Sequence, residues 1–238
     1  AIDFLYNKIL EEYGNIHDGF FIFDADNLLD PNYISDMNKT FSQGYKIITS
    51  YRNSKNYDSN WISAGYALWF LRESKFLNYS RMLLGTSCAV GGTGFLFHRS
   101  IIEQTGGWKF FLLTEDIEFT VHNVINGEKI GYCENAVVYD EQPEKFSQSW
   151  KQRLRWAKGF LQVFQNYGAE LIKSIFKRKS FACYDMTMTI IPAMFLTVIT
   201  GIINIVYAFY RALLGLSLGG ILILIFQAFI NMYLILFV

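Results

Sequence analysis

The amino-terminal part of the chain alternates between helix-like and strand-like patterns. Residues 1–13 place apolar side chains at helical spacing, and residues 20–23 form a continuous apolar run typical of a strand covered on both faces. The proline after Asp30 opens a helix over 32–41, and strand composition returns at 45–50. This alternation predicts an α/β fold with a parallel or mixed sheet and helices on its faces.

The middle of the chain continues the same alternation. Residues 61–83 are mostly helical in pattern, and a second helical pattern begins near Thr114 and ends at Gly127, a usual carboxyl-terminal signal. Apolar runs at 130–133 and 136–140 predict two short strands. We therefore expect one α/β domain that extends to about residue 143.

The remaining residues change in character. Residues 144–176 alternate apolar and basic residues at helical spacing, which predicts one or two helices lying on a membrane surface. Residues 186–210 and 212–238 carry no charged side chain, and each stretch is longer than the ~20 residues that cross a membrane. We therefore expect two transmembrane helices, with Arg211 in the short turn between them.

Charge separates these parts further. The 21 basic and 21 acidic residues cancel overall, but residues 1–144 have 11 basic and 19 acidic side chains, whereas residues 145–185 have nine and two. Short basic segments beside a membrane span stay on its cytoplasmic side, so residues 173–179 predict a cytoplasmic location for everything before the first span. A hydrophobic content of 52% against 18% charged residues excludes a disordered chain.

Two carboxylates follow the strand predicted at 20–23. Asp24 and Asp26 are separated by one residue, and side chains two apart on a strand share a face. Open α/β sheets bind ligands at the carboxyl ends of their strands, and paired carboxylates suit Mg²⁺ or Mn²⁺ that also binds a diphosphate. The same pattern occurs in ordinary polar turns, so a metal site and a turn are both open interpretations.

A second motif lies in the long helical stretch. Gln152, Arg155 and Trp156 are spaced to project from one face of a helix. A guanidinium there can bind phosphate oxygens, and an indole can stack on the face of a sugar ring. The alternative is a basic and aromatic helix that simply lies on a membrane.

A third motif, Thr114-Glu115-Asp116, stands at a predicted helix start. The positive end of the helix should keep Asp116 ionised, so this residue is either a first-turn acid or a proton acceptor. The order of the motifs along the chain favours the second interpretation: D-x-D, a glycine-rich turn, T-E-D, Q-x-x-R-W and then apolar helices.

In this order the motifs resemble those of the processive, membrane-integrated family 2 glycosyltransferases, which include cellulose, chitin, hyaluronan and poly-N-acetylglucosamine synthases. The resemblance covers residues 20–160 and implies a Rossmann-like glycosyltransferase (GT-A) core followed by amphipathic interface helices and transmembrane helices. It implies that Asp24 and Asp26 bind the metal and the nucleotide sugar, together with Gln152 and Arg155. Asp116 would be the catalytic base, and the residues that bind the acceptor would be Glu115, Trp156, Gly92, Thr93 and Gly94.

The resemblance also implies an activity and its partners. The expected reaction is the inverting transfer of a sugar from a UDP-sugar to a polysaccharide or lipid-linked acceptor, with Mg²⁺ or Mn²⁺ as cofactor. Membrane lipids and export or accessory subunits are expected partners, whereas nucleic acid is not. The alternatives are a non-processive transferase that glycosylates a lipid, and a non-catalytic membrane subunit with the same fold.

These inferences together predict three regions. Residues 1–143 would be a cytosolic catalytic core that lacks the family's first nucleotide-binding segment. Residues 144–185 would contain the Q-x-x-R-W helix and basic membrane-interface helices, and residues 186–238 would form two transmembrane helices. We thus expect an integral cell-membrane protein whose catalytic part is cytoplasmic.

Overall fold

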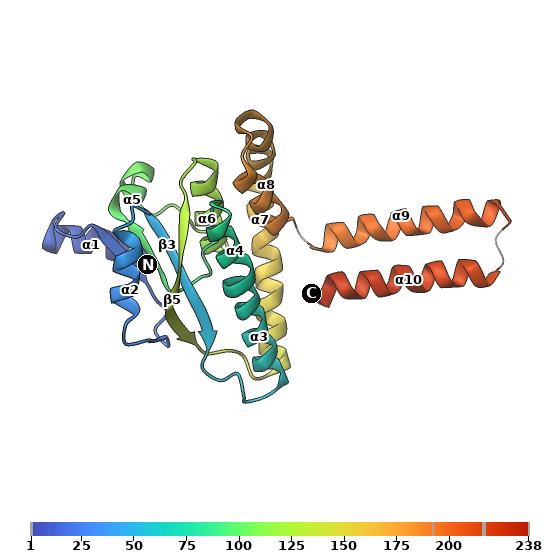
Figure 1. Ribbon diagram of the computed structural model, residues 1–238, viewed down its shortest axis with the longest axis horizontal. Helices are drawn as coiled ribbons and strands as arrows, with labels where there is room; N and C mark the ends of the chain where they lie inside the picture. The colour runs from blue at the N-terminus through green and yellow to red at the C-terminus, as the bar shows by residue number, and fades with distance from the viewer. Residues whose placement is uncertain (1, 192, 216–217, 238) are drawn as a thin grey trace. The chain divides into compact units, whose positions relative to one another are not determined.

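The structure, a computed structural model, describes residues 2–191, 193–215 and 218–237. The described residues form two compact units that divide after Thr187. In the first unit a five-stranded sheet has helices on its faces, as Figure 1 shows. The predicted α/β class is therefore confirmed.

The sheet is mixed. It contains β1 (Gly19–Ile22), β2 (Leu28–Leu29), β3 (Ile47–Ser54), β4 (Phe95–His98) and β5 (Ile130–Asp140), in the order β1-β4-β3-β5-β2. β3 and β5 are parallel neighbours, and the other neighbouring strands are antiparallel. Because β4 runs opposite to both β1 and β3, the strands β1, β3 and β5 all point the same way. Their carboxyl ends therefore meet at one edge of the sheet.

Two strand predictions need correction. β1 was expected to be covered on both faces, but all four of its residues are only half-buried, because β1 is an edge strand that pairs with β4 alone. The two short strands expected at 130–133 and 136–140 are one strand, β5. Its register against β3 shifts between Ser50 and Tyr51, which leaves residues 134–136 without partners on β3 and interrupts the apolar pattern.

Most helices before residue 180 agree with the predicted patterns, but α5 and the start of α8 were not predicted. The segment 61–83 is helical throughout, but its centre is a π-helical turn, η1, which the pattern did not predict. The helical elements are α1 (Ile2–Tyr13), α2 (Tyr33–Phe41), α3 (Trp61–Leu71), η1 (Arg72–Asn78), α4 (Tyr79–Leu83), α5 (Arg99–Thr105), α6 (Glu115–Ile125), α7 (Phe146–Arg178) and α8 (Phe181–Ile190).

The core lies on both faces of the sheet because side chains alternate along each strand. On β4, Leu96 packs in a cluster with Tyr33 of α2. Its neighbours Phe95 and Phe97 face the other way, and their ring centroids lie 5.7 and 6.1 Å from that of Phe119 on α6. Helices α2 and α6 thus cover opposite faces of the sheet.

The second unit is a helical hairpin of α9 (Ala193–Leu213) and α10 (Leu218–Phe237), which pack against each other. The continuous helix predicted over 186–210 is wrong, because α8 ends at Ile190 and α9 begins at Ala193, on either side of a proline in the sequence. Residues 192, 216, 217 and 238 of the predicted spans lie outside the described residues. Within the described ranges, no helix has both the length and the apolar character needed to cross a membrane, so the prediction of two spans is not supported there.

Candidate active site

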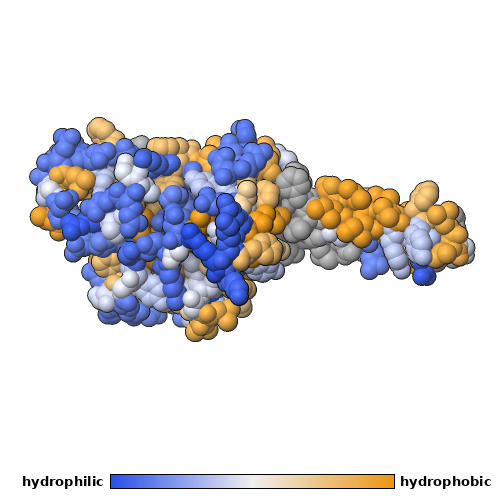
Figure 2. All heavy atoms as spheres, turned by 90° about the horizontal axis from the view of Figure 1, so that it is seen from above, coloured by the Kyte–Doolittle hydropathy of each residue, from blue (hydrophilic) through white to orange (hydrophobic). Residues whose placement is uncertain are grey.

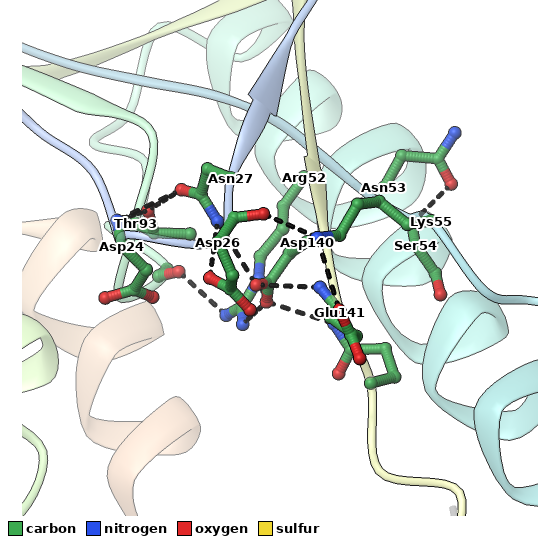
Figure 3. A network of polar contacts seen from close by, with 12 residues as sticks. Asp24, Asp26, Asn27, Arg52, Asn53, Ser54, Lys55, Thr93, Asp140 and Glu141 are labelled. Atoms are coloured by element: carbon green, nitrogen blue, oxygen red, sulfur yellow. Dashed lines mark hydrogen bonds and ion pairs between the residues drawn. The ribbon is translucent and has the colours of Figure 1, made fainter.

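Three carboxylates gather where the carboxyl ends of β1, β3 and β5 meet. Asp24 and Asp26 follow β1, and Asp140 is the last residue of β5. Each of the three offers a carboxylate oxygen, and these oxygens lie within 4.8 Å of one another. Figure 3 shows this cluster with Arg52, which reaches it from β3. The D-x-D pair therefore lies where the carboxyl ends of the parallel strands meet, the edge at which open α/β sheets usually bind ligands.

The two predicted carboxylates lie in a turn and not on a strand face, because β1 already ends at Ile22. The Asn27 amide donates to the Asp24 carbonyl at 3.1 Å and closes the D-A-D-N turn, residues 24–27. The Asp24 amide donates to Thr93 Oγ1 at 3.0 Å and to Asn27 Oδ1 at 3.2 Å, and the Thr93 hydroxyl donates to the same Oδ1. Thr93, assigned to the acceptor by resemblance, therefore anchors the D-A-D-N turn.

Asp140 was not predicted as a site residue. It is 4% exposed, and its Oδ1 accepts from Asn27 Nδ2 at 3.2 Å and from the Glu141 amide at 3.0 Å. Its Oδ2 accepts from Arg52 Nε at 2.9 Å, from Arg52 Nη2, and from Gln142 Nε2 at 3.0 Å. An acid at the end of a predicted strand was the available signal, since the carboxyl-end argument used for Asp24 applies to it equally.

The donor set fits a hard divalent cation. Asp24 and Asp26 are exposed, whereas both oxygens of Asp140 already accept hydrogen bonds. Although part of Asp24 faces solvent, neighbouring protein atoms partly desolvate its carboxylate and raise its pKa above the usual value. The negative charges of Asp140 and Asp26 raise this pKa further, while Arg52 opposes them. Bound Mg²⁺ or Mn²⁺ would offset this repulsion, so Asp24 and Asp26 are the residues that could hold the ion.

The T-E-D motif lies beside the glycine-rich turn. Asp116 is in the first turn of α6, and Gly92 faces it with φ +73°, in the left-handed region that favours glycine. A Cβ atom on Gly92 would lie 3.5 Å from Asp116 Oδ2 and 3.5 Å from Arg52 Nη1. A side chain at position 92 would therefore lie close to both the guanidinium and the carboxylate, and glycine leaves that space free.

The sequence predicted that the positive end of the helix keeps Asp116 ionised. The structure differs, because the pKa of Asp116 is raised. Burial raises its pKa to about 7, and the negative charges of Glu115 and Glu73 act in the same direction. A hydrogen bond from the Ile117 amide and the charge of Arg52 lower the pKa only in part. A carboxylate with a pKa near neutrality is well suited to accept a proton from a hydroxyl group.

The Q-x-x-R-W motif lies on α7. Trp156 is half-buried and packs edge-on against Tyr66 of α3, with ring centroids 5.8 Å apart. Arg155 is exposed, and Gln152 is half-buried with its Oε1 buried and without a hydrogen-bond partner among the described residues. In the described part of the chain, no hydrogen bond or ion pair joins these three residues to Asp26 or Asp116. The predicted common face therefore differs in exposure from one residue to the next.

Gly94 and Gly159 explain how closely the motifs approach. Gly94 has φ +67°, and a Cβ there would lie 2.5 Å from Val138 Cγ1, so the glycine-rich turn packs directly on β5. On α7, a Cβ at Gly159 would lie 2.5 Å from Thr114 Cγ2, and the Thr114 side chain is buried. Gly159, which the sequence reasoning missed, lets the Q-x-x-R-W helix contact the T-E-D motif.

We expect Gly159→Ala to destabilise the protein by roughly 1–3 kcal/mol, because the added methyl group overpacks the contact with Thr114. Gly65→Ala is the matched control: Gly65 is inside α3 with no atom within 4 Å of its would-be Cβ, so alanine should stabilise by about 0.5–1 kcal/mol. Urea unfolding of both variants measures the difference. A Gly159→Ala protein as stable as Gly65→Ala would contradict the close contact between α6 and α7.

Comparison with known proteins gives an independent view of this region. A family model described as "Glycosyltransferase like family 2" matches residues 8–159. A probable glycosyltransferase of Bacillus subtilis, YdaM, is 34% identical over 130 residues, which are 55% of this chain and 30% of that protein. A probable glycosyltransferase of Sulfolobus acidocaldarius is 30% identical over 156 residues, 63% of this chain and 33% of that protein.

A poly-beta-1,6-N-acetyl-D-glucosamine synthase of Staphylococcus aureus is 34% identical over 80 residues, 34% of this chain and 19% of that protein. The chain thus matches about a third or less of the length of these curated relatives. The family model extends over more than half of the chain and includes the D-A-D-N turn, the T-E-D motif and the Q-x-x-R-W motif. The chain therefore belongs to the glycosyltransferase-like family 2.

Proposed function

We propose that this protein is an inverting glycosyltransferase that transfers a sugar from a UDP-sugar to a carbohydrate or lipid-linked acceptor. One observation carries the proposal: the D-A-D-N turn and a carboxylate with a pKa of about 7 lie on two sides of the same glycine-rich turn. A cation-binding pair of carboxylates suits a diphosphate, and a nearby base suits a hydroxyl acceptor.

The reaction would be a single displacement. The oxygen of the acceptor hydroxyl forms a bond to the anomeric carbon as the bond from that carbon to the diphosphate oxygen breaks. The electron pair leaves with UDP, and the hydroxyl proton passes to Asp116. Attack from the side opposite the leaving group inverts the anomeric centre.

The residues of this chain would divide the remaining tasks. A bound Mg²⁺ or Mn²⁺ ion, held by Asp24 and Asp26, would neutralise charge on the diphosphate. Arg155 is exposed and can pair with a phosphate oxygen, and Gln152 has a buried amide oxygen that can accept a hydrogen bond. The uncovered part of Trp156 would stack on the acceptor sugar, and Glu115 would also contact the acceptor.

The first donor to test is UDP-N-acetylglucosamine. The Staphylococcus aureus relative is named for a polymer of N-acetyl-D-glucosamine, and its similarity to this chain supports the same sugar here. We propose a β-linked polymer as the product, since inversion of an α-linked nucleotide sugar yields a β linkage. Transfer of one sugar to a lipid is the other outcome that the experiment below resolves.

We also propose that the protein acts at the cytoplasmic face of the cell membrane. The hairpin of α9 and α10 exposes large apolar side chains, including Ile203 at 61%, Phe209 at 70% and Phe226 at 67%, and hydrophobic residues cover much of its surface in Figure 2. Water-exposed apolar area of this kind indicates contact with lipid or with another protein. Membrane lipids, together with export or accessory subunits, would cover it.

The test uses the full-length protein. Membrane and soluble fractions of expressing cells are incubated with Mn²⁺ and radiolabelled UDP-N-acetylglucosamine, UDP-glucose, UDP-galactose or UDP-glucuronic acid, and the products are sized. We expect one donor to label a product, with the activity in the membrane fraction. No labelled product from any donor would contradict the proposed function, and activity confined to the soluble fraction would contradict the proposed location.

A further inference from the structure

A single guanidinium group contacts the structure around each of the motifs. Arg52 lies near the end of β3, and its side chain is 16% exposed. Its Nε donates to Asp140 Oδ2 at 2.9 Å, and its Nη1 donates to the carbonyl of Gly91 at 3.0 Å. Its Cζ lies 4.1 Å from the ring centroid of Phe70 on α3. Three fixed contacts in different directions leave the guanidinium one orientation.

The first contact leads to the D-A-D-N turn. Asp140 accepts from Arg52 on one oxygen and from Asn27 on the other, and Asn27 also accepts from the Asp24 amide and from Thr93. Loss of the guanidinium would leave the buried Asp140 carboxylate without a cation. The position of the turn therefore depends on Arg52 through Asp140.

The second contact leads to Asp116. Arg52 holds the Gly91 carbonyl, and at the next residue, Gly92, the space of a missing Cβ lies 3.5 Å from both Arg52 Nη1 and Asp116 Oδ2. The charged groups that act on Asp116 are Arg52, Glu115 on α6 and Glu73 on η1. Arg52 is the cation among them, so it favours the ionised form of Asp116 against the two glutamates.

The third contact leads to the Q-x-x-R-W motif. The guanidinium lies over Phe70, whose ring centroid is 6.3 Å from that of Tyr66, and Tyr66 packs against Trp156 at 5.8 Å. Tyr66 is fully buried, and its hydroxyl is 3.2 Å from Ser149 Oγ on α7. This continuous aromatic row connects Arg52 to the helix that carries Trp156.

We propose that Arg52 is a positioning residue, which holds the D-A-D-N turn, Asp116 and the Trp156 helix in one arrangement and supplies the positive charge that keeps Asp116 able to accept a proton. The role of Asp116 in this statement rests on the proposed function. The contacts of Arg52 themselves do not.

The kinetic test compares two substitutions in the full-length protein. Arg52→Lys keeps the charge but loses the forked geometry, so we expect a roughly 10- to 100-fold lower kcat with the acid limb of the pH–rate profile unchanged. Arg52→Gln should lower kcat similarly and also move the acid limb to higher pH, because the pKa of Asp116 rises when the cation is removed. Lys39→Gln, which removes an exposed charge on α2, is the control and should change neither quantity. Equal acid limbs in the Gln and Lys variants would overturn the proposal.

A second test needs no activity and so separates this proposal from the proposed function. The stability gained on replacing Asp116 by Asn is measured at pH 8 and pH 5, in wild-type protein and in Arg52→Gln protein, as a double-mutant cycle. We expect a larger gain at pH 8 in the Arg52→Gln background, since Asp116 has there lost its favourable partner. Equal gains in the two backgrounds would overturn the proposal, even if transfer activity is never detected. If Arg52→Gln does not fold, the same cycle with Arg52→Met decides, and equal gains there overturn the proposal too.

Discussion

Asp116→Asn should lower the rate of sugar transfer by roughly 100-fold or more, while the affinity for UDP stays close to the wild-type value. Asparagine keeps the size and one hydrogen-bonding oxygen of the side chain but cannot take a proton from the acceptor. Steady-state transfer kinetics and calorimetric titration with UDP and Mn²⁺ measure the two quantities. Glu115→Gln is the matched comparison, because Glu115 is the adjacent carboxylate and would be the base if Asp116→Asn remained active.

The pKa of Asp116 adds a pH dependence to this prediction. With a pKa of about 7, Asp116 is protonated in acid and cannot accept a proton, so the wild-type transfer rate should fall as the pH decreases below 7. The residual activity of Asp116→Asn should not show this fall. A wild-type rate that is flat from pH 5 to pH 8 would show that the base is another group.

The same pKa predicts that Asp116→Asn is more stable than the wild type at alkaline pH. In the unfolded chain an aspartate has a pKa of about 3.9, so the folded protein binds this proton more tightly, and the free energy of unfolding decreases as the pH rises from about 4 to 7. Asp116→Asn carries no charge and avoids this loss. It should therefore be more stable than the wild type at pH 8, by roughly 1–3 kcal/mol, and about equally stable at pH 4.

Asp26→Asn should abolish Mn²⁺-dependent binding of UDP. Asp24 and Asp26 are the exposed members of the carboxylate cluster, and removal of one charge takes a ligand from a cation that has few others available. The measurement is titration with UDP in the presence of Mn²⁺ and in the presence of a chelator. Asp58→Asn, an exposed aspartate in the loop between β3 and α3, is the control and should bind as the wild type does. Unchanged Mn²⁺-dependent affinity in Asp26→Asn would refute the metal site.

Local periodicity in the sequence was sufficient to predict α1, α6 and α7, because apolar side chains at helical spacing have to face a core wherever the helix packs. The motif residues could also be selected from the sequence, since D-x-D, T-E-D and Q-x-x-R-W are each short and local. These patterns identified the class of chemistry. They did not contain the distances between the motifs.

The tertiary structure decided which residues surround the candidate site. Arg52 and Asp140 are 88 positions apart, and Thr93 lies 69 positions from the Asp24 amide to which its hydroxyl is bonded. No local pattern predicts such pairs, because they arise only from the order and direction of the strands. The same holds for the pKa of Asp116, where burial and the charges of Glu115 and Glu73 outweigh the helix end that the sequence suggested as dominant. Electrostatic effects depend on what surrounds a group in space, and here that environment comes from three separate elements of the fold.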